Sequence, residues 1–133
     1  MIKKASAVLS VCIMLVACCS FFLGGCNTSS LDYVGAYVND NGSLGVGIFE
    51  NDTYKVLYFD GSGYSGSCYI KKITENEVEV TFISSYKIKY NSSTGEPTSK
   101  TYSGATIKKE NDEISLYLHF TTGSSSQRLV KTT

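Results

Sequence analysis

The sequence predicts an all-β fold, a small antiparallel up-and-down β-barrel of about eight strands, preceded by an apolar signal helix. Apolar and polar residues alternate with a period of two through most segments after residue 30, which is typical of strands with one buried and one wet face. The segments between them are short and rich in Gly, Asn and Asp, as tight turns are. No window of about a dozen residues shows helical periodicity. Closing the strands into a barrel removes exposed sheet edges, and a two-sheet β-sandwich is the alternative arrangement.

The first 25 residues form a segment separate from this domain. Lys3 and Lys4 open it, and an uncharged run over residues 5–24 leads to Cys26. A basic start, an apolar core and small residues before a cleavage site are features of a secretory signal peptide. The run is also long enough to cross a bilayer as an uncleaved helix, but no basic cluster follows Cys26. We therefore expect a signal peptide over 1–25, a short polar tether over 26–30 and one barrel domain over 31–133.

The expected strands follow one another with turn residues between them. The Asn41-Gly42 step after the first strand is a strong hairpin signal because both residues tolerate positive φ. Cys68 shares an inward face with other apolar residues in the middle of the chain, and Leu116 lies on the clearest apolar face near its end. Residues 91–97 contain the only Pro and are expected to form the longest polar loop. The strands are expected at residues 31–38, 44–49, 53–59, 64–71, 77–82, 86–90, 98–109, 114–120 and 127–131.

The cysteines and the single histidine offer no metal site and no disulfide framework. Three of the five cysteines lie in the signal segment and Cys26 follows it, which leaves Cys68 in the domain. One Cys and one His cannot hold a zinc ion without unrecognised carboxylate ligands. Cys68 is expected to be a buried, small apolar side chain. His119 lies between Leu118 and Phe120, so we expect a surface His facing solvent, without a nucleophile that it could serve as general base.

Charge and composition exclude several classes of function. After loss of Lys3 and Lys4, 10 basic residues stand against 12 acidic ones, a net charge of −2, which favours neither nucleic acid nor an anionic membrane surface. No constellation of His, Cys and carboxylates points to catalysis, so the sequence predicts neither an enzyme nor a cofactor. Tyr is the one enriched residue with binding potential, because its ring joins apolar area to a hydroxyl. Strand packing is the ordinary role of such residues, and the candidates for an aromatic-lined ligand site are Tyr37, Tyr64, Tyr86 and Tyr90.

The end of the signal segment resembles a known processing motif. Its residues Leu23-Gly24-Gly25-Cys26 are similar to the lipobox of bacterial lipoproteins. The resemblance implies that Cys26 receives a diacylglyceryl group and becomes the first mature residue. Two acyl chains anchor a protein stably, whereas one chain is marginal. The expected location is therefore the extracytoplasmic face of the cell membrane, with the lipid on Cys26 as the membrane partner.

A second resemblance concerns the barrel. Gly35-Ala36-Tyr37 on the first strand, with Arg128 on the last, resembles the lipocalin and avidin (calycin) arrangement. It implies a barrel mouth closed by stacking of the Arg128 cation on the Tyr37 ring. Residues 35–43 also resemble the first hairpin of avidin, with Asn39 and Ser43 at the spacing of polar biotin contacts. Avidin-type sites use several Trp rings and this chain has none, so the resemblance implies the barrel and not a biotin site.

The expected function is that of a membrane-anchored, non-catalytic binding module of the cell envelope, for a small apolar ligand or an envelope component such as a protein. The alternative is a protein-interaction or inhibitor module that acts through loops such as residues 91–97. A ligand-sized space inside the barrel would favour the first, and a filled interior with exposed apolar side chains would favour the second.

Overall fold

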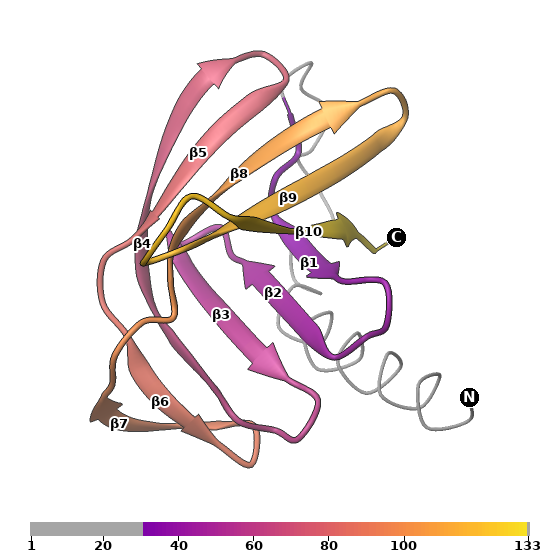
Figure 1. Ribbon diagram of the computed structural model, residues 1–133. Coiled ribbons are helices and arrows are strands. Elements are labelled where there is room, and N and C mark those ends of the chain that lie inside the picture. The colour runs from indigo at the N-terminus through magenta and orange to yellow at the C-terminus, as the bar shows by residue number, and fades with distance from the viewer. Residues whose placement is uncertain (1–30, 133) are drawn as a thin grey trace.

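The structure is a computed structural model that describes residues 31–132, all of it strands and turns without a helix (Figure 1). The signal peptide, Cys26 and the tether lie outside the described residues. Ten strands are present: β1 (Gly35–Val38), β2 (Leu44–Ile48), β3 (Thr53–Tyr58), β4 (Gly63–Thr74), β5 (Glu77–Phe82), β6 (Tyr86–Lys89), β7 (Ser92–Pro97), β8 (Tyr102–Glu110), β9 (Glu113–Phe120) and β10 (Ser126–Lys131).

Eight of these strands close into an antiparallel barrel. The sheet runs β3-β2-β1-β10-β9-β8-β5-β4, and an additional pairing of β3 with β4 closes the ring. Each strand of the ring pairs with its neighbours in the chain, with two exceptions. The first strand, β1, pairs with the last, β10, and β5 pairs with β8 because the β6–β7 hairpin is inserted between them. The predicted barrel is thus confirmed in preference to the sandwich. Closure leaves the wall without a free edge.

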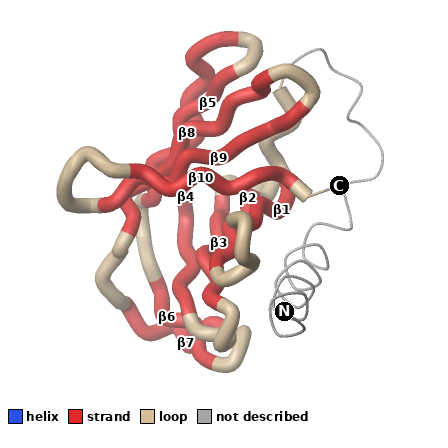
Figure 2. Tube along the Cα trace, turned by 45° about the vertical axis from the view of Figure 1, so that its right-hand side comes forward, coloured by secondary structure: helices blue, strands red, loops and turns tan. Residues whose placement is uncertain are grey.

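The β6–β7 hairpin lies outside the closed wall. β6 pairs with Gly63–Ser65 at the start of β4, whereas β5 pairs with the later part of the same strand. Figure 1 shows the hairpin projecting below β3 and β4, and Figure 2 shows it apart from the wall in a second view. β4 therefore divides one of its edges between the barrel and this projection.

The expected loop at residues 91–97 is a strand, β7, and this prediction was wrong. Tyr90 and Asn91 both have positive φ, 51° and 67°, as the two central residues of a type I′ hairpin turn require. All six residues of β7 are exposed, so no alternation of apolar residues marks the strand. Its outer edge is protected, because the register shifts between Tyr86 and Ile88 and the strand ends at Pro97.

Side chains fill the middle of the barrel. Tyr54 stacks on Phe82 with ring centroids 3.8 Å apart and meets the ring of Tyr64 edge-on at 6.0 Å. The inward faces expected from the alternation are confirmed on β4, β5 and β9, where the buried residues include Cys68, Val78, Val80, Phe82, Leu116 and Leu118. The wall and this core are complete within residues 31–132, so we expect this part of the chain to fold without the residues before it.

One end of the barrel, which we call the N-terminal mouth, brings together the start of β1 and the end of β10. The first described residue, Leu31, donates its N–H to the carbonyl of Glu75 at 3.2 Å. The Lys131 ammonium lies 2.8 Å from the Asp32 carbonyl oxygen and 3.1 Å from its carboxylate. The expected first strand at 31–38 is therefore shortened to β1, because residues 31–34 do not join the ladder and Leu31 bonds to the β4–β5 turn instead.

Candidate functional site

The four candidate tyrosines do not form one site. Tyr37 and Tyr64 are buried in the core, whereas Tyr86 and Tyr90 are exposed on the β6–β7 projection. The Tyr37 hydroxyl donates to the Tyr33 carbonyl at 2.7 Å, and the Tyr64 hydroxyl accepts from the buried N–H of Tyr102 at 3.0 Å. The separation arises because β6 leaves the closed wall, a step that strand alternation does not reveal. The interior pair therefore holds the fold together and offers no ligand surface.

The predicted closing pair of Tyr37 and Arg128 is not brought together. The Tyr37 ring lies inside the barrel, while the Arg128 side chain is 44% exposed on the outside. Tyr37 is opposite Lys131 in the β1–β10 register. Arg128 and Lys131 are three residues apart, and an odd spacing places two side chains on opposite faces of a strand. The cation on the same side of β10 as Tyr37 is thus Lys131. Lys131 holds the position that the resemblance implied for Arg128.

Lys131 packs over Gly35 at the N-terminal mouth. A Cβ added to Gly35 would lie 2.7 Å from Cε of Lys131, and Gly35 has a φ of 149°. Only Gly allows both the backbone geometry and the close approach of the lysine stem. The glycine of the resemblance is therefore accounted for by the structure, although its partner is a different cation.

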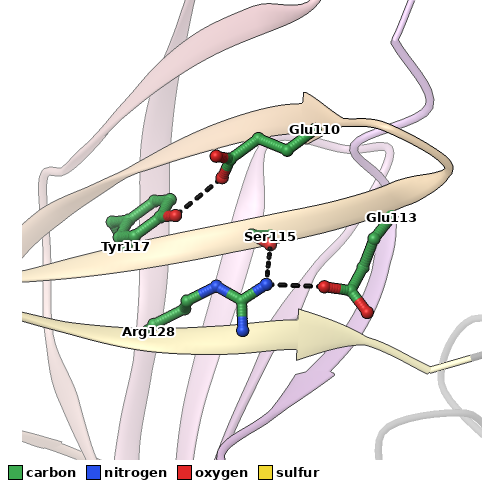
Figure 3. Close-up of polar contacts among 5 residues, drawn as sticks. All are labelled: Glu110, Glu113, Ser115, Tyr117 and Arg128. Atoms are coloured by element: carbon green, nitrogen blue, oxygen red, sulfur yellow. Dashed lines mark hydrogen bonds and ion pairs between the residues drawn. The ribbon is translucent and has the colours of Figure 1, made fainter.

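Arg128 belongs to a polar network on the outer wall (Figure 3). Its guanidinium donates to the Glu113 carboxylate at 2.5 Å and to the hydroxyl of buried Ser115 at 3.0 Å. Beside it, the Tyr117 hydroxyl donates to Glu110 at 2.6 Å. The hydrogen bond to Glu113 raises the pKa of Arg128 above its ordinary value. Such an exposed pair contributes little to stability, and its donors are engaged within the wall.

Asn39 and Ser43, at the spacing of polar biotin contacts, bond within their own hairpin. The Asn39 amide donates to the Ser43 hydroxyl at 3.1 Å, and its oxygen accepts the N–H of Leu44 at 3.2 Å. These bonds satisfy the β1–β2 turn locally.

His119 and Cys68 differ in how they could react. We expected His119 to face solvent, and the structure shows it partly buried. Its Nε2 lies 2.7 Å from the Thr106 hydroxyl oxygen. A hydroxyl beside an imidazole is one element of nucleophilic catalysis, but within residues 31–132 no hydrogen bond orients the other ring nitrogen. Cys68 is buried as expected. Burial, and then the charge of Asp52, raises the pKa of the Cys68 thiol to about 11, which keeps it protonated and unreactive near neutral pH.

A pocket opens at the N-terminal mouth. It has a volume of about 350 Å³. An apolar part is supplied by Leu31, Tyr33, Ile70 and Val78, and a polar part by Asp52, Lys72, Thr74 and Glu75. These residues come from the segment before β1, the β2–β3 turn, the end of β4, the β4–β5 turn and the start of β5. A pocket at a barrel mouth that combines apolar lining residues with polar groups is a candidate small-molecule site.

Sequence reasoning missed this pocket because it ended the fourth strand at residue 71. β4 continues to Thr74, so the inward positions continue through Ile70 and Lys72, which is opposite the buried Val78. The signal was present, since the same alternation that places Cys68 inward extends to Lys72. A lysine at an inward position was not expected, and only closure of the barrel shows that it faces a mouth.

The charged groups of the pocket are not paired with one another. Within residues 31–132 the structure shows no ion pair or hydrogen bond of the Lys72 ammonium. The register of β4 and β5 shifts between Lys72 and Thr74, and Ile73 between them is exposed. Bulges of this kind re-aim side chains beside functional sites. Burial, followed by the charges of Asp52, Cys68 and Glu50, raises the pKa of the Tyr33 hydroxyl that lines the pocket.

In the part of the chain that the structure covers, no group of three or more His, Cys, Asp or Glu residues is placed to hold a metal ion. No helix there is long and apolar enough to span a membrane. Comparison with protein-family models, curated proteins and solved structures found no match.

Proposed function

We propose that the protein is a lipid-anchored, extracytoplasmic and non-catalytic binding module whose ligand occupies the pocket at the N-terminal mouth. The observation that carries the proposal is this pocket, with its apolar lining residues and with Lys72, which has no partner among residues 31–132. The barrel interior is filled around Tyr54 and Phe82, so a ligand would bind at the mouth and not deep inside the barrel.

The position of the pocket relative to the proposed anchor supports a ligand from the envelope. Leu31 lines the pocket, and Cys26 precedes it by five residues. A fully extended chain spans at most about 3.3–3.6 Å per residue, so the pocket would lie within roughly 17 Å of the lipidated sulfur. The mouth therefore stays close to the membrane surface, where amphipathic molecules are concentrated.

The ligand site is tested with the fragment 27–133, after its cooperative unfolding in urea has been verified. The fragment is incubated with an envelope extract, repurified and measured by native mass spectrometry. We expect a bound small molecule on the wild type and its loss in Thr74→Phe, because the new ring fills the pocket. Thr81→Phe is the matched control, since Thr81 is exposed on the outside of β5. Wild-type fragment without any bound species would contradict the proposal.

The anchor is tested separately in cells. We expect wild-type protein in the membrane fraction, with its processing blocked by globomycin, which inhibits the lipoprotein signal peptidase. Cys26→Ala should abolish lipidation and this processing. A Cys26→Ala protein that is still cut and still retained on membranes would count against lipidation.

A second candidate function, a protein-interaction module, is favoured by the tip of the β6–β7 hairpin. Tyr90 is 78% exposed there and has a positive φ of 51°, which is unusual for an aromatic residue. The Asn91 N–H donates to the Gly61 carbonyl at 2.8 Å and holds the tip on the β3–β4 turn, where Phe59 is 65% exposed. Residues with a strained backbone conformation often lie at functional sites. Tyr90→Asn should relieve the strain, and loss of a defined protein complex in this variant would support the second candidate.

A further inference from the structure

We infer that the pocket at the N-terminal mouth recognises a zwitterionic group, with an anion bound by Lys72 and an ammonium bound by Asp52 and Glu75. This inference rests on the proposed function and specifies its ligand class. The shared chemistry is an amine and an oxyanion on one small molecule, carried by an aminophospholipid headgroup or by a free amino acid.

The cationic side of the pocket is Lys72. It follows Ile70 on the inward face of β4, is opposite the buried Val78 of β5, and lines the pocket just before the register shift. Lys71, its neighbour, lies on the opposite face and is opposite Glu79 in the register. Lys72 has no acceptor within the described residues, whereas Lys131 at the same mouth is bound to Asp32. Of these two cations, Lys72 is the one available to an incoming anion.

The anionic side consists of two carboxylates on different turns. Asp52 lies in the β2–β3 turn with a φ of 59°, and its charge contributes to raising the pKa of both Tyr33 and Cys68. Glu75 lies in the β4–β5 turn and lines the pocket, and its backbone carbonyl accepts the N–H of Leu31. Neither carboxylate is within 4.0 Å of the Lys72 nitrogen as an ion pair would be. A zwitterion can therefore join groups that the protein holds apart.

The balance of charge argues against a simple anion. One lysine faces two carboxylates, so a ligand with only negative charge meets net repulsion, and a ligand with only positive charge leaves Lys72 unused. The apolar floor formed by Leu31, Ile70 and Val78 covers the nonpolar part of the ligand. A volume of about 350 Å³ suits a headgroup or an amino acid, since small-molecule pockets begin at roughly 300 Å³.

The inference is tested by isothermal titration calorimetry of fragment 27–133 with four probes at concentrations below micelle formation. Dihexanoyl phosphatidylethanolamine carries both charges on a lipid, and leucine carries both on a soluble molecule. Dihexanoyl phosphatidylglycerol has the anion alone, and hexyl glucoside is uncharged. We expect at least one zwitterion to bind about tenfold or more tightly than the anionic and uncharged probes, the effect of one charge-assisted contact. Tighter binding of the phospholipid assigns a headgroup, and tighter binding of leucine assigns a free amino acid.

Variants separate the charges from the pocket itself. Lys72→Gln should weaken zwitterion binding about tenfold, whereas the matched Lys71→Gln should change it less than twofold. Glu75→Gln and Asp52→Asn should reduce the preference for phosphatidylethanolamine over phosphatidylglycerol, and Asn tolerates the positive φ of position 52. If hexyl glucoside binds as tightly and Lys72→Gln has no effect, the inference is overturned while the proposed function stands. If no probe binds and native mass spectrometry finds no ligand, both are overturned.

Discussion

The hydroxyl of Tyr64 provides the sharpest test of whether the interior tyrosines are structural. The Tyr64→Phe substitution keeps the ring and its edge-on contact with Tyr54 at 6.0 Å. It removes the acceptor of the Tyr102 N–H, a buried bond of 3.0 Å. A buried donor left without an acceptor costs about 1–3 kcal/mol. For a domain of this size, each kcal/mol lowers Tm by roughly 4–8 °C.

The assay is equilibrium unfolding in urea, with Tyr69→Phe as the matched control. Tyr69 is 59% exposed on the outside of β4, so its substitution should change the free energy of unfolding by less than about 0.5 kcal/mol. Ligand binding at the N-terminal mouth should persist in Tyr64→Phe, because Tyr64 does not line that pocket. An unchanged free energy of unfolding, or loss of ligand binding with unchanged stability, would refute the structural role assigned to this hydroxyl.

Three further predictions concern the mouth, the core thiol and the outer wall. Gly35→Ala should lower the free energy of unfolding by about 2–3 kcal/mol, through backbone strain and contact with Lys131. Gly123→Ala is the control, because Gly123 has a φ of 81° but no atom within 4 Å of the added Cβ, and it should cost about 1 kcal/mol. Equal losses in urea would show that the Lys131 side chain moves aside without cost. The folded pKa of Cys68, about 11, lies above its ordinary 9.0, so the unfolded chain loses this proton first and stability falls as pH rises through that window. Between pH 8 and pH 10 the wild type should lose about 1.4 kcal/mol more than Cys68→Ala in urea titrations, and parallel losses would contradict the assignment. Arg128→Ala should lower the urea midpoint only slightly, and high salt should shrink that loss. A larger, salt-independent loss in urea would point to burial of Ser115 as the main contribution of the arginine.

The alternation of apolar and polar residues predicted the barrel wall well, because a strand with one buried face has an apolar residue at every second position. The inward positions at Cys68, Val80 and Leu118 follow from that period, and the structure buries all three. Where both faces of a strand are exposed, as in β7, no such pattern exists. The turn at Tyr90 and Asn91 was equally hard to predict, since tyrosine rarely adopts positive φ.

The candidate site was harder to predict than the wall. Grouping Tyr37 with Tyr86 required knowledge of which strands close the ring, and β6 does not belong to it. The pairing of Tyr37 with Arg128 depended on the position of Arg128 along β10, and the register gives that place to Lys131. A shift of one residue along a strand changes the face of a side chain, so a resemblance without register cannot assign a pair.

By itself the sequence determined the local features of this protein. It specified strands, turns and an inward apolar face because these depend on neighbouring residues, and it predicts a lipidated Cys26 from four contiguous positions. The tertiary structure alone decided which groups meet at the N-terminal mouth. Asp52, Lys72 and Leu31 come from three separate segments, and their approach depends on barrel closure, on the bulge at Ile73 and on the register of β4 with β5. Those are long-range pairings, for which local sequence carries no period or motif.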